Sequence, residues 1–307
     1  MNETENRAGK MVGMEVSRMW FKAVCLDADG KMLDVYRYPI GGDQTLFSQI
    51  IKFIKDVKTR FGDFENIGVA VPGLVHRETK RVAFSTFIPE HEAIDFLVEM
   101  EAATNLKITI ENDANAAGYG EFVAGAGRGS SSIFYATLGT GIGGAIIFGG
   151  KVWHGVSGFA GEFGHFAINS DGIKLEDVAS AASIVRRTKS RFQQDSTSSL
   201  SSLDEEEIGL KDVIKAAQEG DDFAVLMLQR TGKYVGTALA GVINLLNVEK
   251  IIIGGGIMQA ETLVLDAIIK RAKELSFKPS FQATQIVSGE LGGNAAAIGA
   301  ALLSAQS

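Results

Sequence analysis

The sequence has little of several residue types, and each shortage excludes a class of protein. Its 307 residues include one cysteine, Cys25, so a disulfide within the chain is impossible and a cysteine-based zinc site is not expected. Lysine and arginine number 30 against 37 aspartates and glutamates, a formal net charge of −7. This balance does not favour binding to nucleic acid. No apolar run reaches about 18 residues, so we expect no membrane-spanning helix.

Proline is scarce, whereas glycine is abundant. The chain has 4 Pro and 36 Gly, and glycine makes up about 7% of an average protein. An excess of glycine without proline indicates backbone that turns tightly or approaches something closely. The polar start, MNETENRAGK, lacks the apolar core of a signal peptide. We expect it to be a frayed tail on a soluble, cytoplasmic protein.

Apolar periodicity predicts an α/β protein in which one pattern recurs. In the first section we expect strands at 11–16, 20–26, 31–38, 66–71 and 106–110, with helices at 45–61, 93–104 and 114–124. A similar section begins with strands at 132–138, 145–148 and 151–154 around a glycine turn at 139–144. An exposed linker at 196–204, helices at 210–219, 221–245 and 261–275, a strand at 250–253 and a final small-residue helix from 292 follow. The recurrence suggests duplicated domains.

The glycine turn contains a literal G-x-G-x-x-G at Gly139, Gly141 and Gly144. A dinucleotide site requires these glycines to open a helix, whereas here they join two predicted strands. A glycine hairpin with Thr140 can still hold phosphate through backbone N–H groups and a hydroxyl. A tight turn without a ligand is an equally good interpretation.

Two polar clusters are candidates for a site. Asp113 follows a predicted strand and begins a helix, so it is either a helix N-cap or a general base, with Asn112 beside it for sugar hydroxyls. Glu162 and His165 are three residues apart among small neighbours, which leaves room for a ligand. A structural histidine is the commoner interpretation. A metal pair is the alternative, but a third ligand is hard to find, since no cysteine is near and His154 is eleven residues from His165. Glu176 alone reads as a solvated helix carboxylate.

Four segments together resemble the ROK family of bacterial repressors, open-reading-frame proteins and sugar kinases. They are residues 111–118 (ENDANAAG), 138–144 (LGTGIGG), 158–165 (GFAGEFGH) and 253–256 (IGGG). The resemblance covers the chain from about residue 12. It implies two actin-like ATPase (ribonuclease H-like) domains with a central cleft. The expected domains are 11–124 plus the C-terminal helix 292–307, and 125–291.

The resemblance also implies roles for particular residues. Asp113 would be the catalytic base of a glucokinase-like, ATP-dependent phosphoryl transfer to a hexose or N-acetylhexosamine, with Mg²⁺ accompanying ATP. The hexose would contact Asn112, Asp113, Glu162, His165 and Glu176. The nucleotide would contact Gly139, Thr140, Gly141, Gly143, Gly144, Gly254, Gly255 and Gly256. A homodimer is usual in the family.

Two departures from the family pattern bear on function. ROK kinases carry Asp-x-Gly-Gly-Thr as a first phosphate loop, whereas this chain has EVSRM at 15–19, with Ser17 and Arg18 in place of glycines. The family's cysteine-rich zinc loop is replaced by a short, cysteine-free segment at 166–175, so no structural zinc is expected. The first departure supports an alternative, a sugar-binding or regulatory ROK protein with little or no kinase activity. Only about ten polar residues precede the first strand, so we expect no DNA-binding domain.

Overall fold

The structure is a computed structural model, and it describes residues 9–192 and 197–306. Most of the expected polar tail and the first residue of the expected linker lie outside these ranges. Two compact units are distinguished. The first comprises residues 1–129, 145–161 and 290–307, and the second comprises 130–144 and 162–289. The domain boundaries expected from the sequence stay a prediction.

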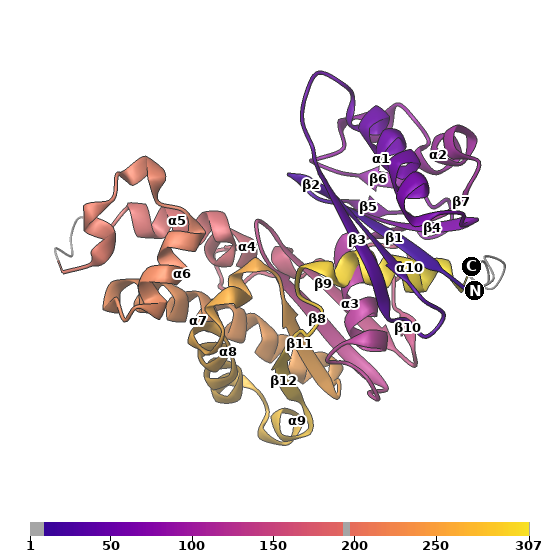
Figure 1. The fold of residues 1–307 in the computed structure, drawn as a ribbon. Coiled ribbons are helices and arrows are strands. Elements are labelled where there is room, and N and C mark those ends of the chain that lie inside the picture. The colour runs from indigo at the N-terminus through magenta and orange to yellow at the C-terminus, as the bar shows by residue number, and fades with distance from the viewer. Residues whose placement is uncertain (1–8, 193–196, 307) are drawn as a thin grey trace. The chain divides into compact units, whose positions relative to one another are not determined.

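The first unit is built on a five-stranded sheet of order β3-β2-β1-β4-β7 (Figure 1). Its strands are β1 (Met11–Val16), β2 (Trp20–Leu26), β3 (Met32–Pro39), β4 (Asn66–Val71) and β7 (Lys107–Asn112). The hairpin-linked strands β1, β2 and β3 pair antiparallel, whereas β4 is parallel to both β1 and β7. A small hairpin of β5 (Leu74–Val75) and β6 (Val82–Phe84) follows β4.

Helices cover both faces of this sheet because its strands alternate apolar side chains between two cores. Phe21, Ala23 and Cys25 pack in the core shared with α1 (Leu46–Phe61) and α2 (Phe96–Thr104). Val24 and Leu26 face the opposite core, which α3 (Asp113–Ala124) and α10 (Ala295–Ser304) complete. The last helix of the chain therefore belongs to the first unit, beside strands from its beginning (Figure 1).

Helix α10 approaches α3 closely through glycines. A Cβ atom added at Gly299 would lie 1.7 Å from the carbonyl oxygen of Ala116, and one at Gly120 would lie 2.6 Å from that of Ala295. Neither position has room for a side chain, because the obstructing atoms are backbone. The small-residue composition expected for the last helix thus has a packing cause.

The second sheet repeats the order of the first: β10-β9-β8-β11-β12. Its strands are β8 (Ser132–Leu138), β9 (Ile142–Phe148), β10 (Lys151–Val152), β11 (Lys250–Gly254) and β12 (Gln285–Ser288). The helices of the second unit are α4 (Leu175–Ala179), α5 (Ala181–Lys189), α6 (Leu210–Gln218), α7 (Asp222–Leu246), α8 (Thr262–Leu275) and α9 (Lys278–Ala283). Two sheets of the same strand order agree with the duplication expected from the sequence.

Several local predictions are wrong. The glycine turn ends at residue 141, because Gly143 and Gly144 lie within β9. The helix expected at 221–245, by contrast, is confirmed and is continuous as α7. The linker expected to be exposed contains a short 3₁₀ helix, Ser199–Ser202, in which Leu200 is buried, and a second one, Glu205–Glu207, follows it. The strands β5, β6 and β12 and the helices α4, α5 and α9 were not predicted.

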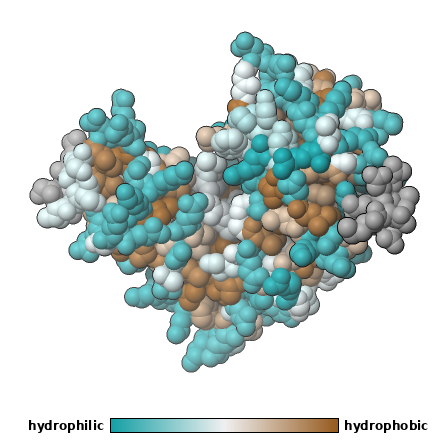
Figure 2. Space-filling model, viewed as in Figure 1, coloured by the Kyte–Doolittle hydropathy of each residue, from teal (hydrophilic) through white to brown (hydrophobic). Residues whose placement is uncertain are grey.

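The surface carries scattered apolar side chains. The most exposed are Val156 and Leu245, and the hydrophobic residues on the face drawn in Figure 2 form separate groups among hydrophilic ones. Such scattering is ordinary for a folded protein. Among the helices described, none combines the length and apolar character that crossing a bilayer requires.

Candidate functional site

The junction of β7 and α3 holds the first candidate residues, in the first unit. Asn112 ends β7 and is the N-cap of α3: its Oδ1 accepts a hydrogen bond from the backbone N–H of Asn115 at 3.0 Å. Its Nδ2 donates to the carbonyl oxygen of Gly73, also at 3.0 Å. The interpretation of Asp113 as the N-cap is therefore wrong, since Asn112 caps the helix.

Asp113 is the first residue of α3 and is half-buried. Its Oδ1 accepts from the backbone N–H of Ala114 at 2.9 Å. A carboxylate in the first turn of a helix is stabilised by the positive end of the helix dipole. This position therefore suits a carboxylate that acts as a general base.

Two residues that support this junction were not identified as such from the sequence. Glu111 is buried beneath it, and Oε2 of Glu111 lies 2.7 Å from Nε2 of His154. Oε1 of Glu111 accepts from the side-chain Nδ2 of Asn115 at 3.1 Å. From the sequence, His154 is considered only as a distant third metal ligand for Glu162 and His165, and 43 residues separate it from Glu111. The spacing of residues in the chain contains no signal for such a pair.

The second unit brings together Glu162, His165 and Glu176. Glu162 immediately precedes a 3₁₀ turn, Phe163–His165, and its carbonyl oxygen accepts from the backbone N–H of His165 at 3.1 Å. Oε2 of Glu176, on α4, accepts from the backbone N–H of Ile142 at 2.7 Å. Glu176 is half-buried, so its interpretation as a solvated helix carboxylate is wrong. Its carboxylate ties α4 to the strand that follows the glycine turn.

The electrostatics of this cluster centre on Glu162. The residue is exposed to solvent, yet the surrounding protein desolvates its carboxylate, and this raises the pKa of Glu162 above its ordinary value. The charge of His165 opposes the rise in pKa, and that of Glu176 adds to it. The three side chains thus influence one another electrostatically within the second unit.

The glycine turn after β8 is short and held at both ends. The backbone N–H of Gly139 donates to the carbonyl oxygen of Gly141 at 3.0 Å, and the carbonyl oxygen of Gly139 accepts from the first residue of α5, Ala181, at 2.8 Å. Thr140 is exposed at the tip and lines a cavity of about 720 Å³. The walls of that cavity are mostly apolar, and its lining includes both basic and acidic side chains. It is lined by Thr140, Ala181, Ala182, Val185, Arg186, Lys189, Ser190, Glu205 and Leu210.

The three glycines at the carboxyl end of β11 have different surroundings. A Cβ at Gly254 would meet the hydroxyl of Tyr135 at 2.3 Å, and one at Gly255 would meet the carbonyl oxygen of Leu138 at 2.3 Å. Gly255 also has φ +93°, a conformation that favours glycine. These two positions therefore require glycine for packing against β8. At Gly256 nothing lies within 4 Å of an added Cβ, so its backbone is open to a ligand.

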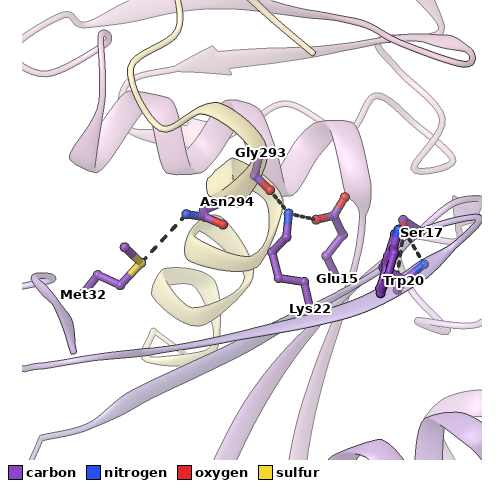
Figure 3. Close-up of polar contacts among 7 residues, drawn as sticks. All are labelled: Glu15, Ser17, Trp20, Lys22, Met32, Gly293 and Asn294. Carbon is purple, nitrogen blue, oxygen red and sulfur yellow. Dashed lines mark hydrogen bonds and ion pairs between the residues drawn. The ribbon is translucent and has the colours of Figure 1, made fainter. Parts of the chain in front are cut away.

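The stretch at 15–19 forms a tight hairpin tip between β1 and β2 (Figure 3). The backbone N–H of Ser17 donates to the carbonyl oxygen of Trp20 at 3.0 Å, and Oγ of Ser17 accepts from the N–H of Trp20 at 3.1 Å. Arg18 and Met19 are exposed at the tip. The serine hydroxyl thus closes the loop upon itself.

Lys22, on the β2 strand of this hairpin, is buried. Lys22 is 7% exposed, and its Nζ lies 3.4 Å from Oε2 of Glu15 and donates to the carbonyl oxygen of Gly293 (Figure 3). A buried charge requires such partners. Glu15, which stands where the family's first phosphate loop has aspartate, is therefore paired with a cation of the chain itself.

The segment that stands in place of the family's zinc loop is held by its own backbone. The N–H of Ile168 donates to the carbonyl oxygen of Ile173 at 2.9 Å, and that of Leu175 donates to Phe166 at 2.9 Å. Oδ1 of Asn169 accepts from the N–H of Ile173 at 3.0 Å. These bonds fix the start of α4, and with it the position of Glu176.

Comparison with known proteins identifies the family. A sequence model of the ROK family matches residues 11–307. The chain belongs to the ROK family. It is 31% identical to a glucokinase of Thermotoga maritima, over 95% of this chain and 96% of that protein. It is 29% identical to the xylose repressor of Bacillus subtilis, over 95% of this chain and 76% of that protein.

A solved ROK glucokinase has the same fold. The structure of the Streptomyces griseus enzyme with glucose and AMPPNP superposes with a TM-score of 0.85 at 30% identity, over 97% of this chain and all of that chain. The fold is accordingly the actin-like ATPase fold of the ROK sugar kinases, as expected from the four sequence segments.

Proposed function

We propose that this ROK protein is an ATP-dependent sugar kinase that phosphorylates a hydroxyl of a hexose or N-acetylhexosamine. The observation that carries the proposal is the β7–α3 junction, where the Asn112 cap leaves the Asp113 carboxylate in the first turn of α3. Full-length similarity to two glucokinases, one of them solved with a sugar and a nucleotide analogue, supports the same reaction.

In this mechanism Asp113 accepts the proton of the attacking sugar hydroxyl. Asn112, Glu162, His165 and Glu176 hold the other hydroxyls of the sugar. Carboxylates, an amide and an imidazole together offer both acceptors and donors, as a polyhydroxylated ring requires. Phosphoryl transfer depends chiefly on positioning and on stabilisation of charge, so these side chains contribute mainly by orientation.

The nucleotide is proposed to bind the second unit. The hydroxyl of Thr140 and the backbone of Gly139 and Gly141 would contact phosphate, and the open backbone at Gly256 would lie against the adenosine with Gly254 and Gly255. Gly143 and Gly144, within β9, would support this turn. The cavity of about 720 Å³ beside Thr140 supports this placement, because its walls are mostly apolar and Arg186 and Lys189 are among the residues that line it.

Mg²⁺ fits this arrangement without a dedicated protein site. A magnesium ion bound with a nucleotide takes most of its ligands from phosphates and water. No group of three potential metal-ligating side chains is found within residues 9–192 and 197–306, so the phosphates and one or two carboxylates would hold the ion. It would neutralise charge on the transferred phosphoryl group.

A second candidate is a sugar-binding regulator without kinase activity. The hairpin tip favours it. Ser17 closes the loop, and Glu15 is paired with Lys22, at positions where the kinase pattern of the family has glycine and aspartate. The xylose repressor of Bacillus subtilis, at 29% identity, is a family member named for regulation. For either function we propose a cytoplasmic homodimer.

The deciding experiment measures ADP release from ATP with a panel of hexoses and N-acetylhexosamines, beside calorimetric sugar binding. We expect sugar-stimulated ADP release by the unaltered chain and a loss of at least about 100-fold in kcat for Asp113→Ala, with sugar binding retained. Sugar binding without ADP release would instead establish the regulator. Light scattering tests the dimer.

A further inference from the structure

The carboxylate of Glu111 lies directly beneath the proposed catalytic junction, and both its oxygens are occupied. Oε1 accepts from the backbone N–H of Asn112 at 2.9 Å and from Nδ2 of Asn115 at 3.1 Å. Oε2 lies 2.7 Å from Nε2 of His154. We assign Nε2 of His154 as the donor in this contact, because a carboxylate oxygen is an acceptor.

The three groups that donate to Glu111 differ in how firmly they can hold its carboxylate. Asn112 and Asn115 lie within four residues of Glu111 and move with the junction itself. His154 comes from the segment after β10, which is anchored elsewhere in the first unit. There the backbone N–H of Arg77 donates to the carbonyl oxygen of Ser157 at 2.9 Å. A Cβ at Gly158 would lie 2.3 Å from the carbonyl oxygen of Val75, so this segment sits tightly against the β5–β6 hairpin.

Glu111 is 8% exposed, and a buried carboxylate without a partner is costly. Loss of His154 would leave Oε2 without its 2.7 Å donor, and the side chain would move to regain one. Because Oε1 also holds the backbone of Asn112, such movement would shift Asn112 and, with it, Asp113. A displacement of about 1 Å at a reacting group is enough to slow a reaction by about 100-fold.

We propose that His154 is a positioning residue for phosphoryl transfer: through Glu111 it holds Asn112 and Asp113 in the orientation that the sugar hydroxyl requires. The inference rests on the proposed kinase function and adds to it a residue outside the four family segments. His154 itself contacts neither sugar nor nucleotide in this proposal.

The test compares His154→Leu, which removes the donor, with His154→Gln, whose amide nitrogen can donate to Glu111. His76→Leu is the matched control, because His76 is half-buried in the same region and packs on Phe159. We expect His154→Leu to lower kcat about 10- to 100-fold, with KM for ATP within twofold and the thermal midpoint close to that of the parent. His154→Gln should recover most of the loss, and His76→Leu should retain kcat.

Three results would overturn the inference: kcat of His154→Leu within twofold of the parent, an equal loss in His76→Leu, or no recovery in His154→Gln. If the parent chain phosphorylates no sugar, the proposed function fails, and calorimetric sugar affinity then decides about His154. Weaker sugar binding by about tenfold in His154→Leu but not in His154→Gln would support positioning of Asn112. Equal affinities would overturn it.

Discussion

At the scale of single residues, the adjacent side chains of Asn112 and Asp113 have different roles at the end of β7. Asparagine and aspartate are equally good N-caps, so the sequence leaves open which of the pair caps α3. Asn112 takes this role through its bond to the N–H of Asn115. Asp113 then lies one position into the helix, where its charge is stabilised and its carboxylate has a separate function in the proposed reaction.

A prediction at this scale concerns the pH dependence of sugar binding. Because the pKa of Glu162 is raised, its carboxylate becomes protonated at a higher pH than an ordinary glutamate as the pH falls. We expect hexose affinity, measured by calorimetry between pH 4 and 8, to decrease as the pH falls through this raised pKa. Glu162→Gln should bind the hexose more weakly at pH 7. Its pH profile should also lack the acidic limb, which is this decrease in affinity at low pH.

The charge on His165 lowers the pKa of Glu162, which supplies an internal control. His165→Gln should therefore move the acidic limb to higher pH. The prediction fails if the limb is unchanged in Glu162→Gln or moves to lower pH in His165→Gln. For folding the pH dependence has the opposite sign: the protonated carboxyl is favoured in the folded chain, so stability from this group is lost as pH rises through the raised pKa.

At the scale of elements, glycines set how closely helices can pack. The Cβ of an alanine at 299 would lie 1.7 Å from the carbonyl oxygen of Ala116, so α10 would have to move away from α3. We expect Gly299→Ala to lower the free energy of unfolding by about 3 kcal/mol, measured by urea denaturation. Gly41→Ala is the control, because nothing lies within 4 Å of its added Cβ, and its effect should stay within about 0.5 kcal/mol. Equal effects would contradict the packing account.

The same elements explain how far the sequence predicts the fold. Apolar runs between turn residues define β1, β2, β4 and β8 to the residue, because local pattern and burial agree there. Within α7, Gly232 and Gly236 are residues that disfavour a helix. They allow α8 to pack closely, because a Cβ at Gly232 would lie 2.7 Å from the carbonyl oxygen of Val264. Contacts of this kind join distant segments, and local pattern does not contain them.

The candidate site likewise has one part that the sequence predicts and one part that only the fold shows. The clusters Asn112–Asp113 and Glu162–His165 are visible as motifs, since their members are neighbours in the chain. The bond from Glu176 to the N–H of Ile142 spans 34 residues, and the Glu111–His154 pair spans 43. Only the folded backbone brings these groups together. The closure of the 15–19 hairpin by Ser17 likewise depends on the pairing of β1 with β2.

At the scale of the whole molecule, the first unit is assembled from three separate stretches of chain. Its second core contains Val24 and Leu26 from β2, Tyr119 from α3, and Ala297, Ile298, Ala301 and Leu302 from α10. Removal of residues 290–307 would expose this apolar surface. We expect the shortened chain to lose the near-ultraviolet circular dichroism of a packed core and to aggregate on heating. A chain lacking only 305–307 should behave as the parent, and a native spectrum in the 290–307 deletion would contradict this account.

The position of α10 also fixes an order of events on the ribosome. The glycines of β1 and β4, Gly13 and Gly68, lie against Ala297, Ala300 and Ala301, so these early strands stay uncovered on one face until α10 (Ala295–Ser304) has left the exit tunnel. Domains usually form during synthesis from the N-terminus onward. Here the unit that is begun first is completed last, and a nascent chain stalled before residue 295 would be a substrate for chaperones.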